Sequence, residues 1–171
     1  QILENGLVGV GSTAATVEVM LFTHQSCAYC RTFKDEQLSR FVQEFVETGK
    51  VHLQLGLLNI KKYPQSTAQE KVFICAAQSG KGLQTHKALF SQQVLDGAQS
   101  AVLAKTLGLD AKLFSACLES PETQTLVAQM ERTAMEMDVT LVPTFIINGE
   151  KHVGLMDYAD LEGLLNNALT Q

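Results

Sequence analysis

Tryptophan is absent from this 171-residue sequence, proline occurs only three times, and charged residues make up only 18% of the chain. So few charges argue against a disordered protein, and so few prolines argue against a protein built from linkers. No apolar run approaches the roughly 20 residues that a membrane-spanning helix requires. The 13 basic and 18 acidic residues form no Lys/Arg cluster, so we expect no nucleic-acid partner.

Apolar residues, by contrast, make up 46% of the chain, which is enough for one domain with a substantial core. The four cysteines divide into one close pair, Cys27 and Cys30, and two distant residues, Cys75 and Cys117. Four cysteines are too few for a disulfide-dense scaffold of this length, and their spacing does not provide the two CxxC pairs of a zinc site. Their even number favours an oxidising compartment.

The first part of the chain has the pattern of a β-α-β unit. The nearly continuous apolar run over residues 16–23 is typical of a strand that is covered on both faces. The apolar residues then follow a helical period over residues 27–48, which predicts a helix. Alternation over residues 50–59 predicts a second strand, parallel to the first.

The middle of the chain has helical patterns only. Thr67–Glu70 has the sequence of a capping box, so we expect a helix to open there. A second helix is expected to carry Val94 and to stop near Gly97. Asp110 and the Ser120-Pro121 pair have the form of N-terminal caps for later helices.

Strand signals return after the helical block. Two short strand patterns flank Asn148-Gly149, the strongest two-residue hairpin turn in the chain, and a last helix follows Asp157. The order of elements predicts an α/β fold. One discontinuous domain, residues 1–64 and 139–171, would carry an all-helical insertion over residues 65–138.

The chemistry of the chain is expected at Cys27-Ala-Tyr-Cys30, because this motif lies where a buried strand turns into a helix. The first turn of a helix presents unpaired N–H groups and about half a positive charge, which favour a thiolate at Cys27. Cys30 lies one turn further on and can close a disulfide with it. We therefore expect Cys27 to be the nucleophile and Cys30 the more buried, resolving thiol. Two other interpretations stay open: an inert disulfide, or a metal site in which His24 is a third ligand.

The sequence resembles the DsbA family of thioredoxin-fold thiol-disulfide oxidoreductases across nearly its whole length. The matching features are the Cys27–Cys30 motif, the helical block after the second strand, and the segment Leu141–Gly149 that opens the terminal hairpin. The resemblance implies a thioredoxin fold with an inserted all-helical subdomain. It also implies that the CxxC motif is the redox centre, that Pro143 follows a cis peptide bond beside it, and that the backbone of Val142 binds substrate.

The same resemblance implies a setting for the reaction. The substrates would be cysteine-containing proteins, a DsbB-like membrane protein would be the redox partner, and no metal or organic cofactor would be needed. The expected location is periplasmic or otherwise extracytoplasmic. The sequence begins at Gln1 without a charged and apolar leader, and we expect that a signal peptide has been removed. No long terminal dimerisation segment is visible, so a monomer is expected.

Two positions depart from the family pattern. The residues between the cysteines are Ala28 and Tyr29, whereas the family commonly has proline followed by histidine or tyrosine. Leu21 stands where many family members carry a buried acid on the first core strand. Without that acid, His24 is a candidate proton relay or thiolate-stabilising cation, and the alternative is an exposed loop histidine.

The second cysteine pair, Cys75 and Cys117, falls on two different expected helices, each time beside apolar residues. The two residues are either buried thiols or a structural disulfide, which would stabilise the fold by about 3–4 kcal/mol in the chain-entropy model. Neither interpretation makes this pair catalytic.

Three functions remain open from the sequence. The favoured one is a dithiol oxidase that introduces disulfides into other proteins. The second is a disulfide reductase or isomerase on the same fold. The third is a metal-binding or chaperone module that uses Cys27, Cys30 and His24 as ligands.

Overall fold

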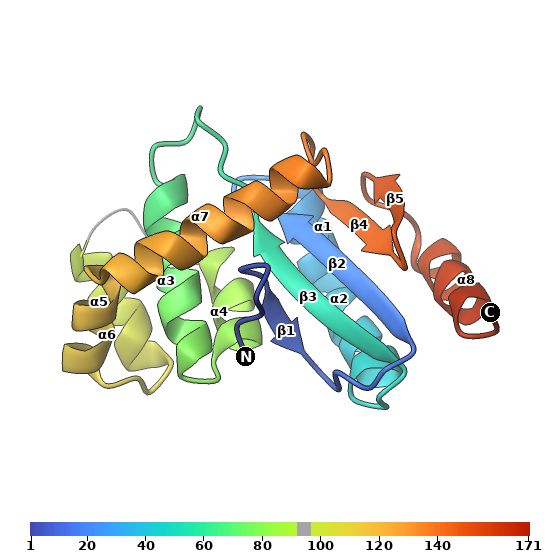
Figure 1. Ribbon diagram of the computed structural model, residues 1–171, viewed down its shortest axis with the longest axis horizontal. Helices are drawn as coiled ribbons and strands as arrows, with labels where there is room; N and C mark the ends of the chain where they lie inside the picture. Colours follow the sequence, from blue (N-terminus) through green and yellow to red (C-terminus); the bar gives the residue numbers. More distant parts are fainter. Residues whose placement is uncertain (92–96) are drawn as a thin grey trace.

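The computed structural model describes residues 1–91 and 97–171, and a mixed five-stranded sheet forms its centre (Figure 1). β2 and β3 run parallel, in register from Val17 opposite Val51 to Thr23 opposite Leu57, and the other neighbouring strands are antiparallel. The parallel pair confirms the predicted β-α-β unit. The spatial order is β1-β3-β2-β4-β5, with the strands β1 (Val8–Val10), β2 (Val17–Thr23), β3 (Val51–Leu57), β4 (Thr144–Ile147) and β5 (Glu150–Val153).

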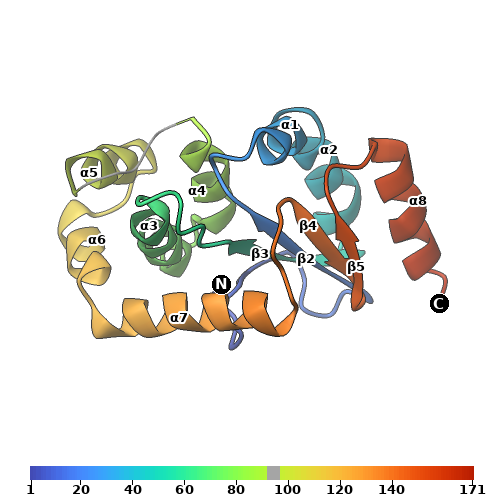
Figure 2. The ribbon, with the colours of Figure 1, turned by 90° about the horizontal axis from the view of Figure 1, so that it is seen from above.

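Helices cover both faces of the sheet. In Figure 2, α7 crosses one face, α1, α2 and α8 lie on the other, and α3, α5 and α6 gather at one end of the molecule. Within the described residues, no helix combines the length and apolarity that crossing a membrane requires. The helical segments are α1 (Ala28–Glu36), α2 (Leu38–Phe41), the π-helical η1 (Val42–Val46), α3 (Ser66–Gln78), α4 (Gly82–Leu89), α5 (Gly97–Thr106), α6 (Ala111–Leu118), α7 (Pro121–Glu136) and α8 (Tyr158–Ala168).

The core forms on both faces of β2, as the apolar run predicted. The successive residues Leu21 and Phe22 point to opposite faces of the sheet, and both are fully buried. On one face, Phe33 of α1 packs edge-on against Phe145 of β4, with ring centroids 5.0 Å apart. This contact seats α1 on the sheet and so positions the start of the helix, where Cys27 lies.

The single helix predicted over residues 27–48 is wrong in detail. α1 ends at Glu36, Gln37 takes a non-helical backbone conformation with φ of −122°, and the chain continues as α2 and η1. The apolar residues on all three segments face the sheet, so their periodicity could not mark the break.

The capping box predicted at Thr67–Glu70 is also wrong. The N-cap residue is Gln65, two residues before Thr67, and it makes no side-chain capping bond, so that α3 begins at Ser66. The carboxyl group of Glu70 instead accepts a hydrogen bond from Asn59 Nδ2 at 2.8 Å. Asn59, a residue from outside the helix, is therefore the hydrogen-bond partner of the Glu70 side chain, which the local pattern assigned to the helix end.

The caps at Asp110 and Ser120 and the hairpin turn are confirmed, whereas Asp157 is the N-cap residue of α8 but makes no side-chain capping bond. Asp110 accepts hydrogen bonds from two N–H groups of the first turn of α6, and Ser120 accepts one from the first turn of α7. Asn148 and Gly149 have φ of 46° and 89° and connect β4 to β5 as the predicted hairpin turn.

The second predicted helix of the middle segment is shorter than expected. α4 ends at Leu89, Val94 lies outside the described residues, and Gly97 begins α5 instead of ending α4. The helices α3–α7 do lie between β3 and β4 in the chain. A division into domains at residues 65 and 138 stays a prediction.

Candidate active site

Cys27 is the N-cap residue of α1. Its backbone is extended, with φ of −84° and ψ of 120°, and its Sγ accepts a hydrogen bond from the backbone N–H of Cys30 at 3.1 Å. The N–H groups of a first helical turn have no partner within the helix, so a sulfur at the N-cap position can take one. The sulfur of Cys27 therefore lies in the partial positive charge of the helix start, as the sequence predicted.

The two cysteines of the motif differ in exposure. Both are free thiols, Cys27 is half-buried, and Cys30 is fully buried. Burial raises the pKa of the Cys30 thiol well above its ordinary value, and the neighbouring Cys27 raises it further. The pair thus has one reachable sulfur and one sulfur that is shielded and held in its thiol form.

The loop before β4 brings Val142 and Pro143 to Cys27, although 115 residues separate Val142 from it along the chain. The Cys27 thiol donates a hydrogen bond to the Val142 carbonyl oxygen at 3.4 Å, and the Val142–Pro143 peptide bond is cis. Thr144 Oγ1 donates to the Leu141 carbonyl at 2.7 Å, and Leu141 itself is 64% exposed. The loop is therefore held at its base and presents an open edge beside the sulfur.

A family model described as Thioredoxin matches residues 4–167 of the chain. The chain belongs to the thioredoxin family. A comparison with curated proteins gives no match.

Solved structures with this thioredoxin fold include several from bacteria. BdbD from Bacillus subtilis is 16% identical, with a TM-score of 0.83 over 100% of this chain and 97% of that chain. Alpha-DsbA1 from Wolbachia pipientis is 15% identical, with a TM-score of 0.83 over 98% of this chain and 92% of that chain. A thioredoxin-like oxidoreductase from Silicibacter pomeroyi DSS-3 is 21% identical, with a TM-score of 0.80 over 97% of this chain and 94% of that chain. These likenesses confirm the resemblance to DsbA at the level of the fold.

His24 lies in the loop between β2 and α1 of this thioredoxin fold, and the expectation of an exposed loop histidine is wrong because it is 1% exposed. Its Nδ1 accepts the backbone N–H of Ser26 at 3.0 Å, so the ring proton lies on Nε2, which donates to Ser66 Oγ at 3.0 Å. The ring stacks on Tyr63, and burial lowers its pKa.

The structure thus gives His24 a neutral ring with both nitrogens engaged outside the cysteine pair. Its backbone carbonyl accepts the N–H of Cys27 at 2.9 Å, so the residue does hold the loop that carries the nucleophile. A relay role for its ring stays a prediction. No cluster of three or more His, Cys, Asp or Glu side chains among residues 1–91 and 97–171 is placed to hold a metal ion.

The second cysteine pair is joined in the structure. Cys75 of α3 and Cys117 of α6 form a disulfide with an S–S distance of 2.02 Å. The bond ties two helices of the segment between β3 and β4, and it lies apart from the Cys27–Cys30 motif in the chain.

A buried acidic group near the same end of the sheet has no counterpart in the sequence analysis. Glu70 of α3 is 1% exposed, and Asn59 Nδ2 donates both to it and, at 2.9 Å, to Glu131 of α7. Burial and the charge of Glu131 raise the pKa of Glu70 to about 8. The only sequence signal at Glu70 was the capping box, which assigned it a different partner.

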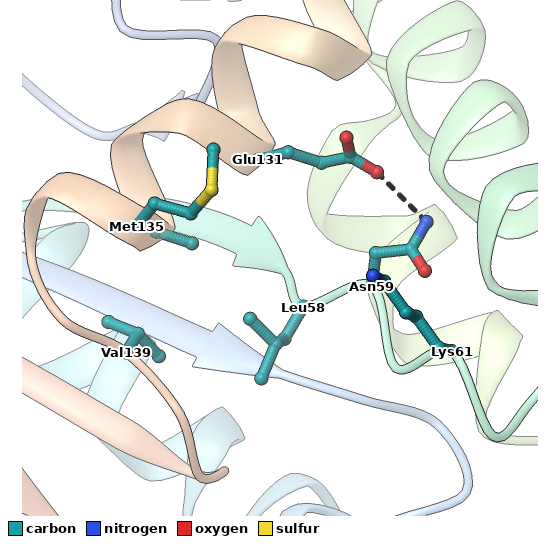
Figure 3. Close-up of a pocket in the computed structure, with 7 residues that line it drawn as sticks. Leu58, Asn59, Lys61, Glu131, Met135 and Val139 are labelled. Atoms are coloured by element: carbon teal, nitrogen blue, oxygen red, sulfur yellow. Dashed lines mark hydrogen bonds between the residues drawn. The ribbon is translucent and has the colours of Figure 1, made fainter.

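Glu131 and Asn59 form one wall of a pocket of about 310 Å³ between the end of β3 and the C-terminal part of α7. Figure 3 shows the hydrogen bond between them, with Leu58, Met135 and Val139 forming the apolar part of the lining. Val139, which lines this pocket, lies three residues before Val142 in the chain.

Proposed function

We propose that this chain is a thiol-disulfide oxidoreductase that exchanges disulfides with cysteine-containing proteins through Cys27 and Cys30. The observation that carries the proposal is the placement of a half-buried Cys27 sulfur at the start of α1, within hydrogen-bond distance of the N–H of a buried Cys30. A redox pair needs two cysteines of unequal exposure, because one sulfur must meet the substrate while the other must stay available within the protein.

The exchange proceeds through a mixed disulfide. A substrate thiolate attacks Cys27 Sγ of the Cys27–Cys30 disulfide, a new S–S bond forms, and Cys30 leaves as a thiolate that takes a proton. A second substrate thiolate then attacks the substrate sulfur of the mixed disulfide and releases Cys27. The substrate loses two electrons and gains a disulfide, and the protein pair is reduced to two thiols.

Val142 and Pro143 are proposed as the substrate platform. The Val142 carbonyl lies 3.4 Å from Cys27 Sγ, so a peptide that pairs with the backbone of Val142 would bring its own cysteine to that sulfur. Leu141, which is 64% exposed, would contact the adjoining substrate residue.

The direction of transfer is proposed to be oxidation. The N–H groups at the start of α1 stabilise the Cys27 thiolate of the reduced protein, and stabilising the reduced form makes the disulfide a stronger oxidant. An extracytoplasmic location, a monomeric state and a DsbB-like membrane partner that restores the disulfide complete the proposal.

Trapping of the mixed disulfide tests the proposal. Cys30→Ala should accumulate a covalent complex with a cysteine peptide disulfide, whereas Cys27→Ala should accumulate none, and non-reducing electrophoresis separates the two results. Equal trapping by both variants, or by neither, would overturn the assignment of the nucleophile.

The measured reduction potential of the pair separates an oxidase from a reductase. We expect a value well above that of thioredoxin, and a value near about −270 mV would favour the reductase instead. Zinc or copper retained in stoichiometric amount by the reduced protein through dialysis would favour the metal-binding alternative over both.

A further inference from the structure

A polar pocket is lined by residues from the start of α1, the start of α3 and the end of α4, three helices that can be located in Figure 2. Its volume is about 470 Å³, which falls in the range of sites that hold small molecules. It is lined by Gln25, Ser26 and Arg31 around the start of α1, by Gln65 and Gln69 at the start of α3, and by the C-terminal end of α4. Ser26, one of the lining residues, directly precedes Cys27 in the chain.

Two of the residues that line the pocket carry a buried side-chain oxygen without a hydrogen-bond partner in the described part of the chain. Gln25 is 6% exposed and Gln69 is 1% exposed, and the Oε1 atom of each has no hydrogen-bond partner among residues 1–91 and 97–171. An unpaired buried acceptor destabilises the fold, so a site that holds two of them gains by receiving N–H or O–H donors. A turn of the two glutamine side chains towards the pocket would pair these oxygens with a ligand that carries hydrogen-bond donors.

Arg31 supplies hydrogen-bond donors and a positive charge in the same pocket. Its guanidinium donates to the Phe90 carbonyl and, at 3.4 Å, to the Gln25 carbonyl. A guanidinium has five N–H donors, so these contacts leave others for a ligand. Among residues 1–91 and 97–171, no carboxylate side chain lines the pocket. A carboxylate is the group that such a cation binds most strongly.

We propose that this pocket binds the carboxylate and amide groups of a small peptide thiol and of its disulfide, and thereby presents their sulfur to Cys27. The proposal rests on the disulfide exchange proposed above and names a substrate class for it. Glutathione carries the required groups: its amide N–H groups suit the free oxygens of Gln25 and Gln69, and its carboxylates suit Arg31. Several donors and a negative charge within one small molecule fit a pocket of this size better than a single protein side chain does.

The reaction balances without a further cofactor. The Cys27 thiolate attacks one sulfur of glutathione disulfide, the S–S bond of the disulfide breaks, and one glutathione leaves as a thiolate. Cys30, once deprotonated, attacks Cys27 Sγ and releases the second glutathione. The two protons of the cysteine thiols end on the two glutathione thiols, so the protein loses two electrons and glutathione disulfide gains them.

The test compares two disulfides as oxidants of the reduced protein in stopped-flow experiments. Glutathione disulfide carries carboxylates and amides, whereas hydroxyethyl disulfide carries neither. Arg31→Gln and Gln69→Leu should each slow oxidation by glutathione disulfide about tenfold, the effect of losing one hydrogen bond to a charged or buried group. Both variants should change the rate with hydroxyethyl disulfide less than about twofold.

Lys34→Gln is the matched control, because it removes the same charge from the same helix one turn beyond Arg31 and outside the pocket lining. It should leave the ratio of the two rates unchanged. An equal loss of rate with both disulfides in Arg31→Gln would mean that Arg31 acts on the thiolate itself, and the pocket would not be a binding site. An equal loss with a cysteine peptide that lacks acidic residues and has an amidated end would assign the pocket to polypeptides, and would also overturn the proposal.

Binding without chemistry separates this proposal from the proposed function. In Cys27→Ser/Cys30→Ser, titration with reduced glutathione should shift the side-chain amide NMR signals of Gln25 and Gln69, and Arg31→Gln should weaken that binding about tenfold. If the protein exchanges disulfides with peptides but these signals do not move, the pocket proposal fails and the proposed function stands. If these signals move but no disulfide reacts with the wild-type protein, the proposed function fails instead.

Discussion

Glu70 offers a sharp test of the electrostatics near the pocket of Figure 3, through the variant Glu70→Gln. The side chain is 1% exposed, and the charge of Glu131 opposes its ionisation. Only the hydrogen bond from Asn59 favours the carboxylate. A glutamine has nearly the same shape as the protonated acid and keeps an oxygen that can accept the Asn59 hydrogen bond.

The expected effect follows from the pKa of Glu70, which rises from an ordinary value of 4.5 to about 8 in the fold. Between these values the folded state keeps a proton that the unfolded state has released, so the free energy of unfolding falls as the pH rises. One such group contributes at most about 1.4 kcal/mol per pH unit. From about pH 5.5 to about pH 7.5 the wild-type protein should therefore lose up to about 3 kcal/mol that Glu70→Gln does not lose.

Urea unfolding at several pH values measures this difference. The matched control is Glu136→Gln, which changes an exposed carboxylate on α7 and should follow the wild-type pH profile. Parallel profiles for wild type and Glu70→Gln would refute the reasoning, because they would mean that Glu70 is ionised in the fold. A Glu70→Gln protein that is less stable than wild type at about pH 8 would refute it as well.

Three further changes have expected outcomes. Burial lowers the pKa of His86 to about 4, so the stability that the neutral ring contributes is present above pH 6.5 and is lost as the pH falls towards 4. His86→Gln should remove this loss in acid unfolding experiments. Gly6→Ala should destabilise the fold by about 3 kcal/mol in urea unfolding, because the φ of Gly6 is +77° and an added Cβ atom would lie 2.4 Å from the backbone of α7. Its control is Gly163→Ala at an exposed position of α8, which should stabilise that helix by up to about 1 kcal/mol. Replacing Cys75 and Cys117 together by alanine should cost about 4 kcal/mol by removing a cross-link over a sequence separation of 42 residues, and an unchanged urea midpoint would contradict a structural disulfide.

The parts of the fold that local patterns encode could be predicted from the sequence. The alternation of β3, the apolar run of β2 and the Asn148-Gly149 turn each depend on neighbouring residues only, and each is confirmed. The caps at Asp110 and Ser120 belong to the same class, because an N-cap residue bonds to N–H groups two or three residues away.

The errors at Glu70 and His24 arise because a distant residue supplies the partner. Glu70 was assigned to a helix end, but its partner Asn59 comes from the loop after β3, and its repulsive neighbour Glu131 comes from α7. His24 was expected in solvent, but Ser66 and Tyr63 of the following segment cover it. No local pattern contains these partners, so the pKa shifts of both groups could not be predicted from the sequence.

The burial of Cys30 and the absence of an acid at Leu21 both bear on the direction of electron transfer. Leu21 is fully buried where an acid would have accepted the proton of the resolving thiol, and burial raises the pKa of Cys30. A thiol held in this form attacks slowly, because only the thiolate is nucleophilic. We therefore expect a second substrate thiol to resolve a mixed disulfide between Cys27 and a substrate protein faster than Cys30 does, and resolution from the substrate side is the step that leaves a new disulfide in the substrate.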